Sequence, residues 1–366
     1  MNSVLDQITR PALLVDKEKV VANIRRMKAK ADRLGMAYRP HFKTHQSLEV
    51  GRWHKSEGIT SITVSSVHMA TYFASEWDDI TIAFPVNLRE VGAISSLLQK
   101  IRKLNLLIES PDVVHRLGRE LTGSVHLFIK IDTGYHRTGV AWQDDQTIRT
   151  ILRAIAEYEH VSFAGFLVHA GHTYDVFGKE AIEPIHQEAI SALEELNKRY
   201  RAENPDMIIS YGDTPSASLM ADFGPVQELR PGNLAYYDVM QMQIGSCSWE
   251  QIAVCMACPV VSVHPERNEL VVYGGGVHLS KDMIELNGRR NYGLPVHFVP
   301  RGWSVPIEGG HVRKLSQEHG VVKLPSNELE KFEPGSLIGI LPVHSCMAVD
   351  CIDDCFTLTG EKLVLL

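Results

Sequence analysis

The chain has 366 residues, of which 44% are hydrophobic and 22% charged, and its net charge is -7 with a pI near 6.2. This composition is typical of a globular protein, and the length allows two domains. The acidic balance argues against a nucleic-acid partner. No run approaches the ~18 apolar residues that a membrane span needs, and residues 1–10 lack the apolar core of a leader. We expect a cytoplasmic protein without a membrane partner.

Six cysteines are too few for a disulfide scaffold in a chain of this length. Cys255 and Cys258 form a CxxC pair inside the apolar run Ile252–Val263. No second CxxC accompanies them, so we expect two buried strand residues rather than a metal or redox pair.

The first two thirds of the chain alternate β-rich runs with helical periodicity. After an opening run at Pro11–Val15, eight strands are expected at Tyr38–Lys43, Ser61–Ser66, Ile80–Val86, Leu104–Glu109, Val125–Asp132, Phe163–His169, Met207–Gly212 and Glu228–Pro231. Apolar residues at helical spacing predict helices over Lys17–Leu34 and Ala181–Tyr200. Strand–helix alternation implies a parallel sheet, and eight units favour a closed (β/α)8 TIM barrel over residues 10–242.

Beyond residue 242 the pattern changes to strands separated by Gly, Pro and Asn. The expected strands are Ile252–Val263, Glu269–Tyr273, His297–Val299, Gly320–Lys323, Leu337–Ile340 and Phe356–Leu366. No long helical period interrupts them. We therefore predict a second, all-β C-terminal domain over residues 243–366, joined by residues 1–9.

Catalytic groups of (β/α)8 barrels lie at the carboxyl ends of strands. This rule selects Lys43, which follows the first expected strand between His41 and His45. Burial at such a position would desolvate the amine and suit it to Schiff-base chemistry. The alternative interpretation is an ordinary surface lysine.

Two glycine-containing turns, the first also rich in hydroxyl side chains, follow the last two strands of the predicted barrel. The first contains Gly212, Asp213 and Thr214, and the second contains Gly232 and Asn233. Backbone amides in such turns can bind a phosphate group. Each turn alone could equally be a helix cap, but their adjacent positions favour phosphate binding.

Two other strand ends carry side chains that could contact a cofactor. Arg137 lies between two glycines after Val125–Asp132, and His169, His172 and Tyr174 follow Phe163–His169. Each of these side chains could instead satisfy a structural hydrogen bond. Their shared position at strand ends is the evidence for a site.

His344 and Cys346 follow the strand Leu337–Ile340. In an extended segment their side chains would face the same side, and mixed nitrogen and sulfur ligation favours zinc. Two protein ligands leave open positions, as in catalytic sites. Simple core packing is the alternative, because the motif is short.

Taken together, these segments resemble the fold-type III pyridoxal-phosphate enzymes, the alanine-racemase-like group. They look most like the family of D-serine dehydratase and D-threonine aldolase. The resemblance covers 9–16, 39–45, 131–140, 169–174, 211–216, 228–238, 274–282 and 342–350.

The resemblance implies roles for individual residues. Lys43 would form the Schiff base with pyridoxal 5'-phosphate, Arg137 would approach the cofactor's phenolic oxygen, and Tyr174 would lie near its ring. The phosphate cup would comprise the turn at 212–214 with 232–233, although Asp213 stands where a small residue is expected. His344 and Cys346 would form the metal pair.

The His-x-Cys pair resembles the zinc-dependent dehydratase branch, whereas the aldolases generally carry His-x-Asp. We therefore expect a lyase that dehydrates and deaminates a D-β-hydroxy amino acid of the D-serine type to a keto acid and ammonia. The near alternative is retro-aldol cleavage to glycine and an aldehyde, and β-hydroxyaspartate is a possible substrate for either reaction.

Two further classes stay open at this stage. Barrel proteins that carry the cofactor without catalysis resemble the N-terminal domain but lack the second one. A metal-only hydrolase would need ligands such as His169 and His172 at strand ends. The resemblance also implies a homodimer.

Overall fold

The computed structural model describes residues 4–366. Contacts between residues divide the chain into two compact units. We call the first the barrel unit, which comprises Arg25–Lys43 and His54–Gly232 together with Leu366. The second, the β unit, comprises Met1–Ile24, Thr44–Trp53 and Asn233–Leu365.

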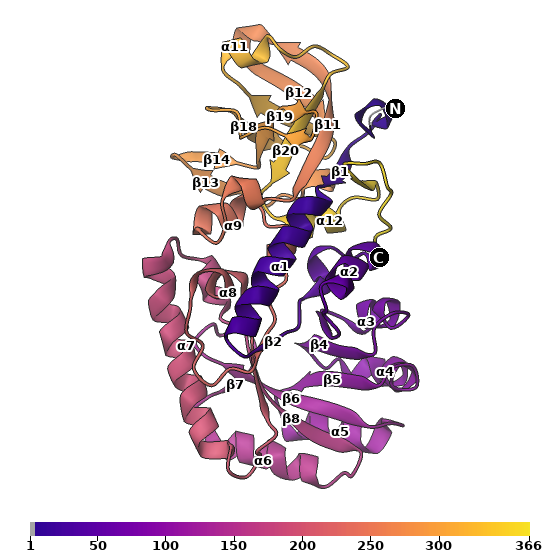
Figure 1. Cartoon of the computed structure of the whole chain (residues 1–366), viewed down its shortest axis with the longest axis vertical. Helices are drawn as coiled ribbons and strands as arrows, with labels where there is room; N and C mark the ends of the chain where they lie inside the picture. The colour runs from indigo at the N-terminus through magenta and orange to yellow at the C-terminus, as the bar shows by residue number, and fades with distance from the viewer. Residues whose placement is uncertain (1–3) are drawn as a thin grey trace. The chain divides into compact units, whose positions relative to one another are not determined.

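Besides the short strand β7 (Val140–Ala141), eight parallel strands form the sheet of the barrel unit (Figure 1). They are β2 (Ala37–Tyr38), β3 (Ile62–Val64), β4 (Asp79–Pro85), β5 (Lys103–Ile108), β6 (Val125–Asp132), β8 (Val161–Val168), β9 (Ile208–Tyr211) and β10 (Glu228–Leu229). The strand order is β2-β10-β9-β8-β6-β5-β4-β3. A parallel bridge between His41 and Thr63 joins the two ends of this order, so the expected barrel is confirmed.

Helices in the barrel unit follow the strands and lie outside them in Figure 1. They are α3 (Val67–Phe73), α4 (Val91–Leu98), α5 (Pro111–Glu120), α6 (Asp145–Ala156), α7 (Lys179–Tyr200) and α8 (Thr214–Leu219). Ser66, Ser110 and Asp144 accept backbone N–H groups at the starts of α3, α5 and α6. These short polar side chains satisfy donors that a helix start leaves unpaired, which fixes where each helix begins.

The barrel interior combines an apolar layer with charged groups. Leu107, Phe128, Ala164 and Leu167 pack together from three neighbouring strands. The buried charged side chains of Arg39 and Glu228 come from other strands: Glu228 lies in β10 and Arg39 directly follows β2. A charged interior is costly unless its groups pair, and the pairing bears on the site described below.

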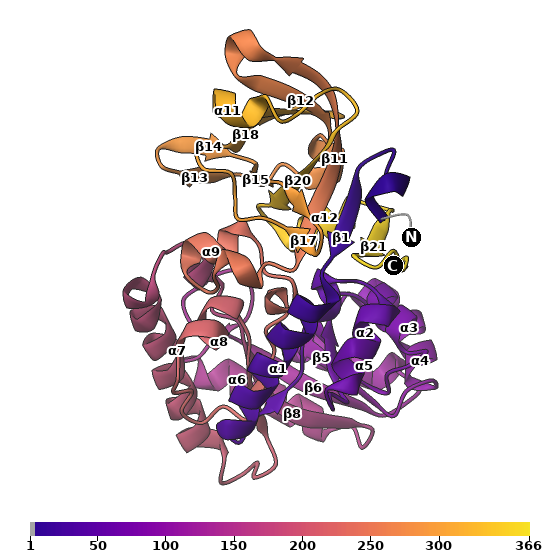
Figure 2. The same cartoon turned by 45° about the horizontal axis from the view of Figure 1, so that its top comes forward.

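A mainly antiparallel sheet forms the β unit, in the order β15-β20-β11-β12-β19-β18, with β1 paired to β11 and β21 paired to β1. The strands are β1 (Ala12–Val15), β11 (Val254–His264), β12 (Glu269–Tyr273), β15 (Gly293–Val296), β18 (His311–Leu315), β19 (His319–Lys323), β20 (Leu337–Pro342) and β21 (Cys355–Thr357). Figure 2 shows β11 and β12 running through this unit as a long ribbon. The expected all-β domain is therefore confirmed.

Several local expectations need revision. The β unit also contains short helices between its strands, namely α9 (Val239–Ile244), α10 (Gly276–Leu279), α11 (Ser326–Leu329) and α12 (Ser345–Asp350). Of the expected strand Phe356–Leu366, only Phe356 and Thr357 lie in a strand of the sheet, β21 (Cys355–Thr357). Cys255 and Cys258 are both buried in β11 and unpaired, as expected.

The unit limits differ from the predicted domains at 10–242 and 243–366. β1 pairs antiparallel with β11 and parallel with β21, because its four apolar residues are all buried in that sheet. Residues 1–3, which the prediction placed with the β domain, lie outside the described residues. Within residues 4–366, no helix is long and apolar enough to cross a membrane.

Gly165 in β8 offers a test of the barrel packing. Its φ is +138°, and a Cβ there would meet the Ile208 carbonyl oxygen of β9 at 1.9 Å. Gly165→Ala should lower the free energy of unfolding by about 2–4 kcal/mol, because strain and strand separation add. Gly92→Ala, in α4 with open space around it, should instead be neutral or stabilise by up to about 1 kcal/mol. Urea unfolding of both variants measures the difference, and equal stability would contradict the clash.

Candidate active site

Lys43 lies in a one-turn 3-10 helix, Phe42–Thr44, that follows β2. Its backbone N–H donates to His41 Nδ1 at 3.3 Å, and the bridge between His41 and Thr63 fixes the segment at the strand end. The expectation that Lys43 is buried was wrong, because the residue is exposed.

A cavity of about 330 Å3 opens beside Lys43 in the barrel unit. Its charged and imidazole-bearing wall residues come from four strands, β2, β6, β8 and β10, or from the positions just after them: His41, Lys43, Lys130, Arg137, His169 and Arg230. None of the described residues that line it is Asp or Glu. Leu107, Leu167 and Phe84 add apolar surface. The wall therefore fits a flat, anionic ligand that can react with an amine, which is the chemistry of pyridoxal phosphate.

The loop that carries Arg137 is held by Asp132. Asp132 Oδ1 accepts the backbone N–H groups of Gly134 and His136, both at 3.0 Å. The Arg137 guanidinium lies 5.0 Å from the centroid of the Tyr135 ring, close enough for a cation–π contact. These contacts keep an exposed arginine at the cavity wall.

His169 is a neutral member of the same wall. Its Nδ1–H donates to the Gly212 carbonyl oxygen. Desolvation, together with the nearby charges of Lys43, Arg137 and Lys130, holds the pKa of His169 well below its usual value. The uncharged ring leaves Nε2 as a hydrogen-bond acceptor.

The turn 212–214 is already tied to the expected Tyr174. The Thr214 N–H donates to Tyr174 Oη at 3.0 Å, and the Gly212 N–H donates to the Val168 carbonyl at 3.1 Å. A phosphate at this turn would therefore contact the hydroxyl of Tyr174, which can donate its own proton, in addition to the backbone of the turn.

Asp213 has a structural partner set that accounts for its presence. Its Oδ1 accepts the Ser216 N–H at 2.6 Å and the Thr173 hydroxyl at 3.1 Å, so the side chain caps α8. Burial raises the pKa of Asp213 to about 6. The carboxylate thus takes the role of helix cap, which was the alternative considered for this turn.

Gly232 and Asn233 differ in what they contribute. A Cβ on Gly232 would meet the His41 carbonyl oxygen at 2.3 Å, so this close approach of two backbone segments needs glycine. The Asn233 amide donates to Asp238 Oδ2 at 2.7 Å within the β unit. A phosphate-binding role for either residue stays a prediction.

Lys130 and Arg230 were missed as individual site residues, although Arg230 belongs to a segment that was singled out. Both are buried and line the cavity. Burial, and then the neighbouring Arg230, lowers the pKa of Lys130 to about 7. The signal that could have found Lys130 is a lysine inside an otherwise apolar strand, Leu127–Ile131.

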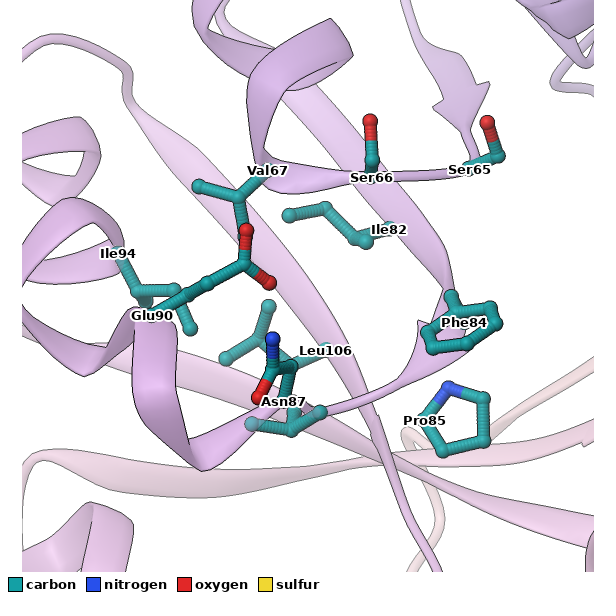
Figure 3. Close-up of a pocket in the computed structure, with 11 residues that line it drawn as sticks. Ser65, Ser66, Val67, Ile82, Phe84, Pro85, Asn87, Glu90, Ile94 and Leu106 are labelled. Atoms are coloured by element: carbon teal, nitrogen blue, oxygen red, sulfur yellow. The ribbon is translucent and has the colours of Figure 1, made fainter.

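A second pocket of about 200 Å3 shares Ser65, Phe84 and Pro85 with the cavity (Figure 3). Ile82, Ile94 and Leu106 form its apolar side, and Glu90 is its charged residue. A pocket with a carboxylate and without lysine or arginine does not suit a phosphate ester, so the Lys43 cavity is the candidate cofactor site.

In the β unit, His344 and Cys346 lie at the start of α12. His344 is the residue before the helix and Cys346 is in its first turn, so the argument from an extended strand was wrong. The two side chains nevertheless interact, because Cys346 is among the groups that act on the His344 imidazole. In residues 4–366 we find no cluster of three or more His, Cys, Asp or Glu side chains suited to a metal ion.

Polar neighbours surround this pair. His344 Nδ1 lies 3.6 Å from Asp282 Oδ2, and Cys346 Sγ lies 3.3 Å from the Thr44 hydroxyl. Burial opposes protonation of His344, but the interactions with Asp282 and Cys346 outweigh it and raise the pKa of His344 to about 11. An imidazole and a thiol with a carboxylate behind the imidazole are donors that suit zinc and orient its ligand.

Family comparisons bear on both units. Residues 15–239 match the family model described as alanine racemase, N-terminal domain, and residues 253–358 match that of a putative serine dehydratase domain. The chain belongs to the alanine-racemase-like family of pyridoxal-phosphate enzymes. The cavity beside Lys43 lies within the part of the chain that the first model covers.

Individual members of this family align over nearly the whole chain. A D-serine dehydratase of Dictyostelium discoideum is 28% identical, over 100% of this chain and 97% of that protein. A D-threo-3-hydroxyaspartate dehydratase of Delftia sp. (strain HT23) is 26% identical, over 94% of this chain and 93% of that protein. A D-threonine aldolase of Arthrobacter sp. is 25% identical, over 93% and 86% respectively.

The fold agrees with a solved structure from the family. The D-threo-3-hydroxyaspartate dehydratase from Delftia sp. HT23 matches with a TM-score of 0.91 at 24% identity, covering 100% of this chain and 99% of that one. The architecture of a parallel barrel with an antiparallel second sheet is therefore that of the family.

Lys130 gives a pH-dependent test of the cavity wall. Its folded pKa of about 7 lies below the ~10.4 of an unfolded lysine, so the buried charge costs stability below pH 7 and ceases to do so as the pH rises toward 10. Lys130→Met should therefore raise the free energy of unfolding of the cofactor-free protein by a few kcal/mol at pH 6, and by much less at pH 10.

Urea unfolding at both pH values measures this gain. Lys100→Met, on an exposed lysine, is the control and should show the same small effect at both. A pH-independent gain from Lys130→Met would mean that the amine is not desolvated.

Proposed function

We propose that this chain is a pyridoxal-phosphate-dependent lyase that removes water from a D-β-hydroxy amino acid of the D-serine type and yields a keto acid and ammonia. The observation that carries the proposal is the cavity beside Lys43, where the amine lies with Lys130, Arg137 and Arg230 and none of the described lining residues is Asp or Glu. The full-length similarity to two dehydratases supports the same reaction.

Lys43 has two tasks in this proposal. Its amine would hold the cofactor through the aldehyde carbon and, when free, would accept the substrate α-proton. The bound cofactor supplies an electron sink for the resulting charge. Arg137, which the family resemblance assigns to the phenolic oxygen, and neutral His169 would orient the ring from the same wall.

His344 and Cys346 are the proposed zinc ligands. Their imidazole and thiol are suitable donors, and Asp282 lies where it can orient the imidazole. With two protein ligands the ion keeps open positions, which is the pattern of a catalytic site. Zinc there would supply Lewis acidity that makes the substrate hydroxyl a better leaving group.

Retro-aldol cleavage to glycine and an aldehyde is the second candidate, favoured by the similarity to a D-threonine aldolase. Product analysis after incubation with D-serine, D-threonine and D-threo-3-hydroxyaspartate separates the two reactions. Keto acid with ammonia supports dehydration, whereas glycine with an aldehyde supports cleavage. We also propose, from the family resemblance, that the chain acts as a homodimer, and we keep the expectation from the sequence that it is cytoplasmic.

The match of residues 253–358 to a serine dehydratase model argues against the two remaining classes. A cofactor carrier that ends after its barrel would have no counterpart of this segment, and a metal-only hydrolase would have no use for the Lys43 cavity.

Lys43→Ala should abolish both cofactor attachment and turnover. Wild-type protein incubated with pyridoxal phosphate should develop a visible absorption band that resists dialysis and should release keto acid from D-serine. The variant should lack the band and lose at least ~1,000-fold in kcat/KM, because both covalent attachment and proton transfer need the amine. Lys100→Ala should match the wild type. Full turnover by Lys43→Ala would refute the proposal.

Substituting the proposed metal ligands should remove zinc from the protein while pyridoxal phosphate stays bound. His344→Ala and Cys346→Ala should retain the visible band, contain less than one tenth of the wild-type zinc by elemental analysis, and lose elimination. Cys247→Ala removes a cysteine elsewhere in the β unit and should leave the visible band, the zinc content and the elimination rate unchanged. Chelation of the wild type should reproduce the loss and added zinc should reverse it. Undiminished elimination by the chelated enzyme would rule out the metal.

A further inference from the structure

A chain of buried polar groups runs through the barrel interior. Asp79, at the start of β4, accepts from Arg39 Nη1 at 2.8 Å, and Arg39 Nε donates to Glu228 Oε2 at 2.6 Å. The side chains of Arg39 and Glu228 are only 5% and 4% exposed. Their charges alternate in sign, which offsets the cost of burying them.

The chain continues from Glu228 to the cofactor cavity. The Ser210 hydroxyl donates to Glu228 Oε1 at 2.6 Å and accepts from Arg230 Nε at 2.6 Å. Arg230 Nη2 donates to the Val168 carbonyl, also at 2.6 Å. Ser210 is therefore the neutral link between a buried carboxylate and a buried guanidinium.

Arg230 faces the ligand cavity at the end of this chain. It is buried yet lines the cavity wall with Lys43. Its Nε and Nη2 have protein acceptors, whereas within residues 4–366 we find none for Nη1. A Cβ at Gly212 would lie 3.1 Å from the guanidinium carbon, so the glycine leaves the space that Arg230 occupies.

Electrostatics explain why the guanidinium needs this support. Burial lowers the pKa of Arg230 to about 10, and Glu228 acts in the opposite direction. Arg230 therefore stays charged at neutral pH. Its two anchored nitrogens allow one orientation only, since any rotation would leave a buried charged donor unpaired.

We propose that Ser210 and Glu228 are positioning residues that hold the guanidinium of Arg230 as a fixed cation in the wall of the cofactor cavity. The inference rests on the proposed function, because it takes this cavity as the pyridoxal-phosphate site. Ser210 and Glu228 act through Arg230, and Arg39 and Asp79 balance the charge of Glu228 behind it.

A fixed cation has a measurable effect on the bound cofactor. The charged or titratable groups of the wall are His41, Lys43, Lys130, Arg137, His169 and Arg230. A positive field disfavours protonation of the cofactor–lysine linkage and so sets the pH midpoint at which the visible band titrates. A group that only stabilises the fold would leave this midpoint unchanged.

Ser210→Ala and Ser210→Thr test the link, because alanine removes the hydroxyl and threonine retains it. Ser210→Ala should weaken pyridoxal-phosphate binding to the cofactor-free protein about tenfold, since Arg230 Nε loses its acceptor. Ser210→Thr should restore binding to within about twofold of the wild type. Ser162→Ala, on an exposed serine of β8, is the matched control and should bind as the wild type does.

Glu228→Gln tests the charge. Glutamine keeps the shape but removes the negative charge, so the net positive field in the cavity grows. The titration midpoint of the visible band should fall by about half a pH unit or more. Cooperative thermal unfolding of each holoenzyme variant verifies that it is folded. If one serine variant fails to fold, the titration midpoint of the visible band in Glu228→Gln tests the positioning role by itself.

The outcomes are distinguishable. Weaker binding by Ser210→Ala that threonine rescues, or a lowered midpoint in Glu228→Gln, supports the positioning role. Wild-type binding by Ser210→Ala together with an unchanged midpoint in Glu228→Gln overturns it. A wild-type protein that never develops a visible band with pyridoxal phosphate overturns the proposed function itself, and this inference with it.

Discussion

Closure of eight parallel strands into a barrel brings residues that are distant in the sequence to one rim. Lys43, Arg137, His169 and Arg230 follow four different strands, yet they line one cavity. Parallel strands all end at the same edge, so the positions just after them converge whatever their spacing in the chain. The bridge between His41 and Thr63 completes this arrangement, because it joins the first strand of the order to the last.

Convergence also concentrates like charges, and the barrel interior offsets the repulsion. Glu228 lies between two arginines, Arg39 and the Ser210-linked Arg230, while Asp79 neutralises the far end. The Lys130 amine donates to the Ile131 carbonyl, and within residues 4–366 no carboxylate is hydrogen-bonded to it. The wall is thus built from one arginine whose charge is supported and one lysine whose charge is disfavoured. Such a wall is suited to an anionic ligand that completes the charge balance.

The pair His344 and Cys346 shows a different route to a site. The two residues lie at the beginning of a short helix, with His344 just before it and Cys346 in its first turn. Asp238 fixes this helix start by accepting the backbone N–H of Ser345 at 2.9 Å and its hydroxyl at 3.1 Å. The same carboxylate accepts from Asn233, so one buried aspartate organises the polar surroundings of the pair. This organisation comes from residues a hundred positions apart in the β unit.

The sequence alone determined the number and order of the barrel strands, the all-β character of the second unit and the segments that carry reactive side chains. These follow from apolar periodicity and from punctuation by Gly, Pro and Asn, which are local properties. Only the tertiary structure decided that β1 pairs in the second sheet, that Lys43 is exposed, that Asp213 caps α8, and that Lys130 and Arg230 are buried beside the same cavity. Burial and charge pairing depend on neighbours brought together by strand closure, and no local pattern encodes which residues those neighbours are.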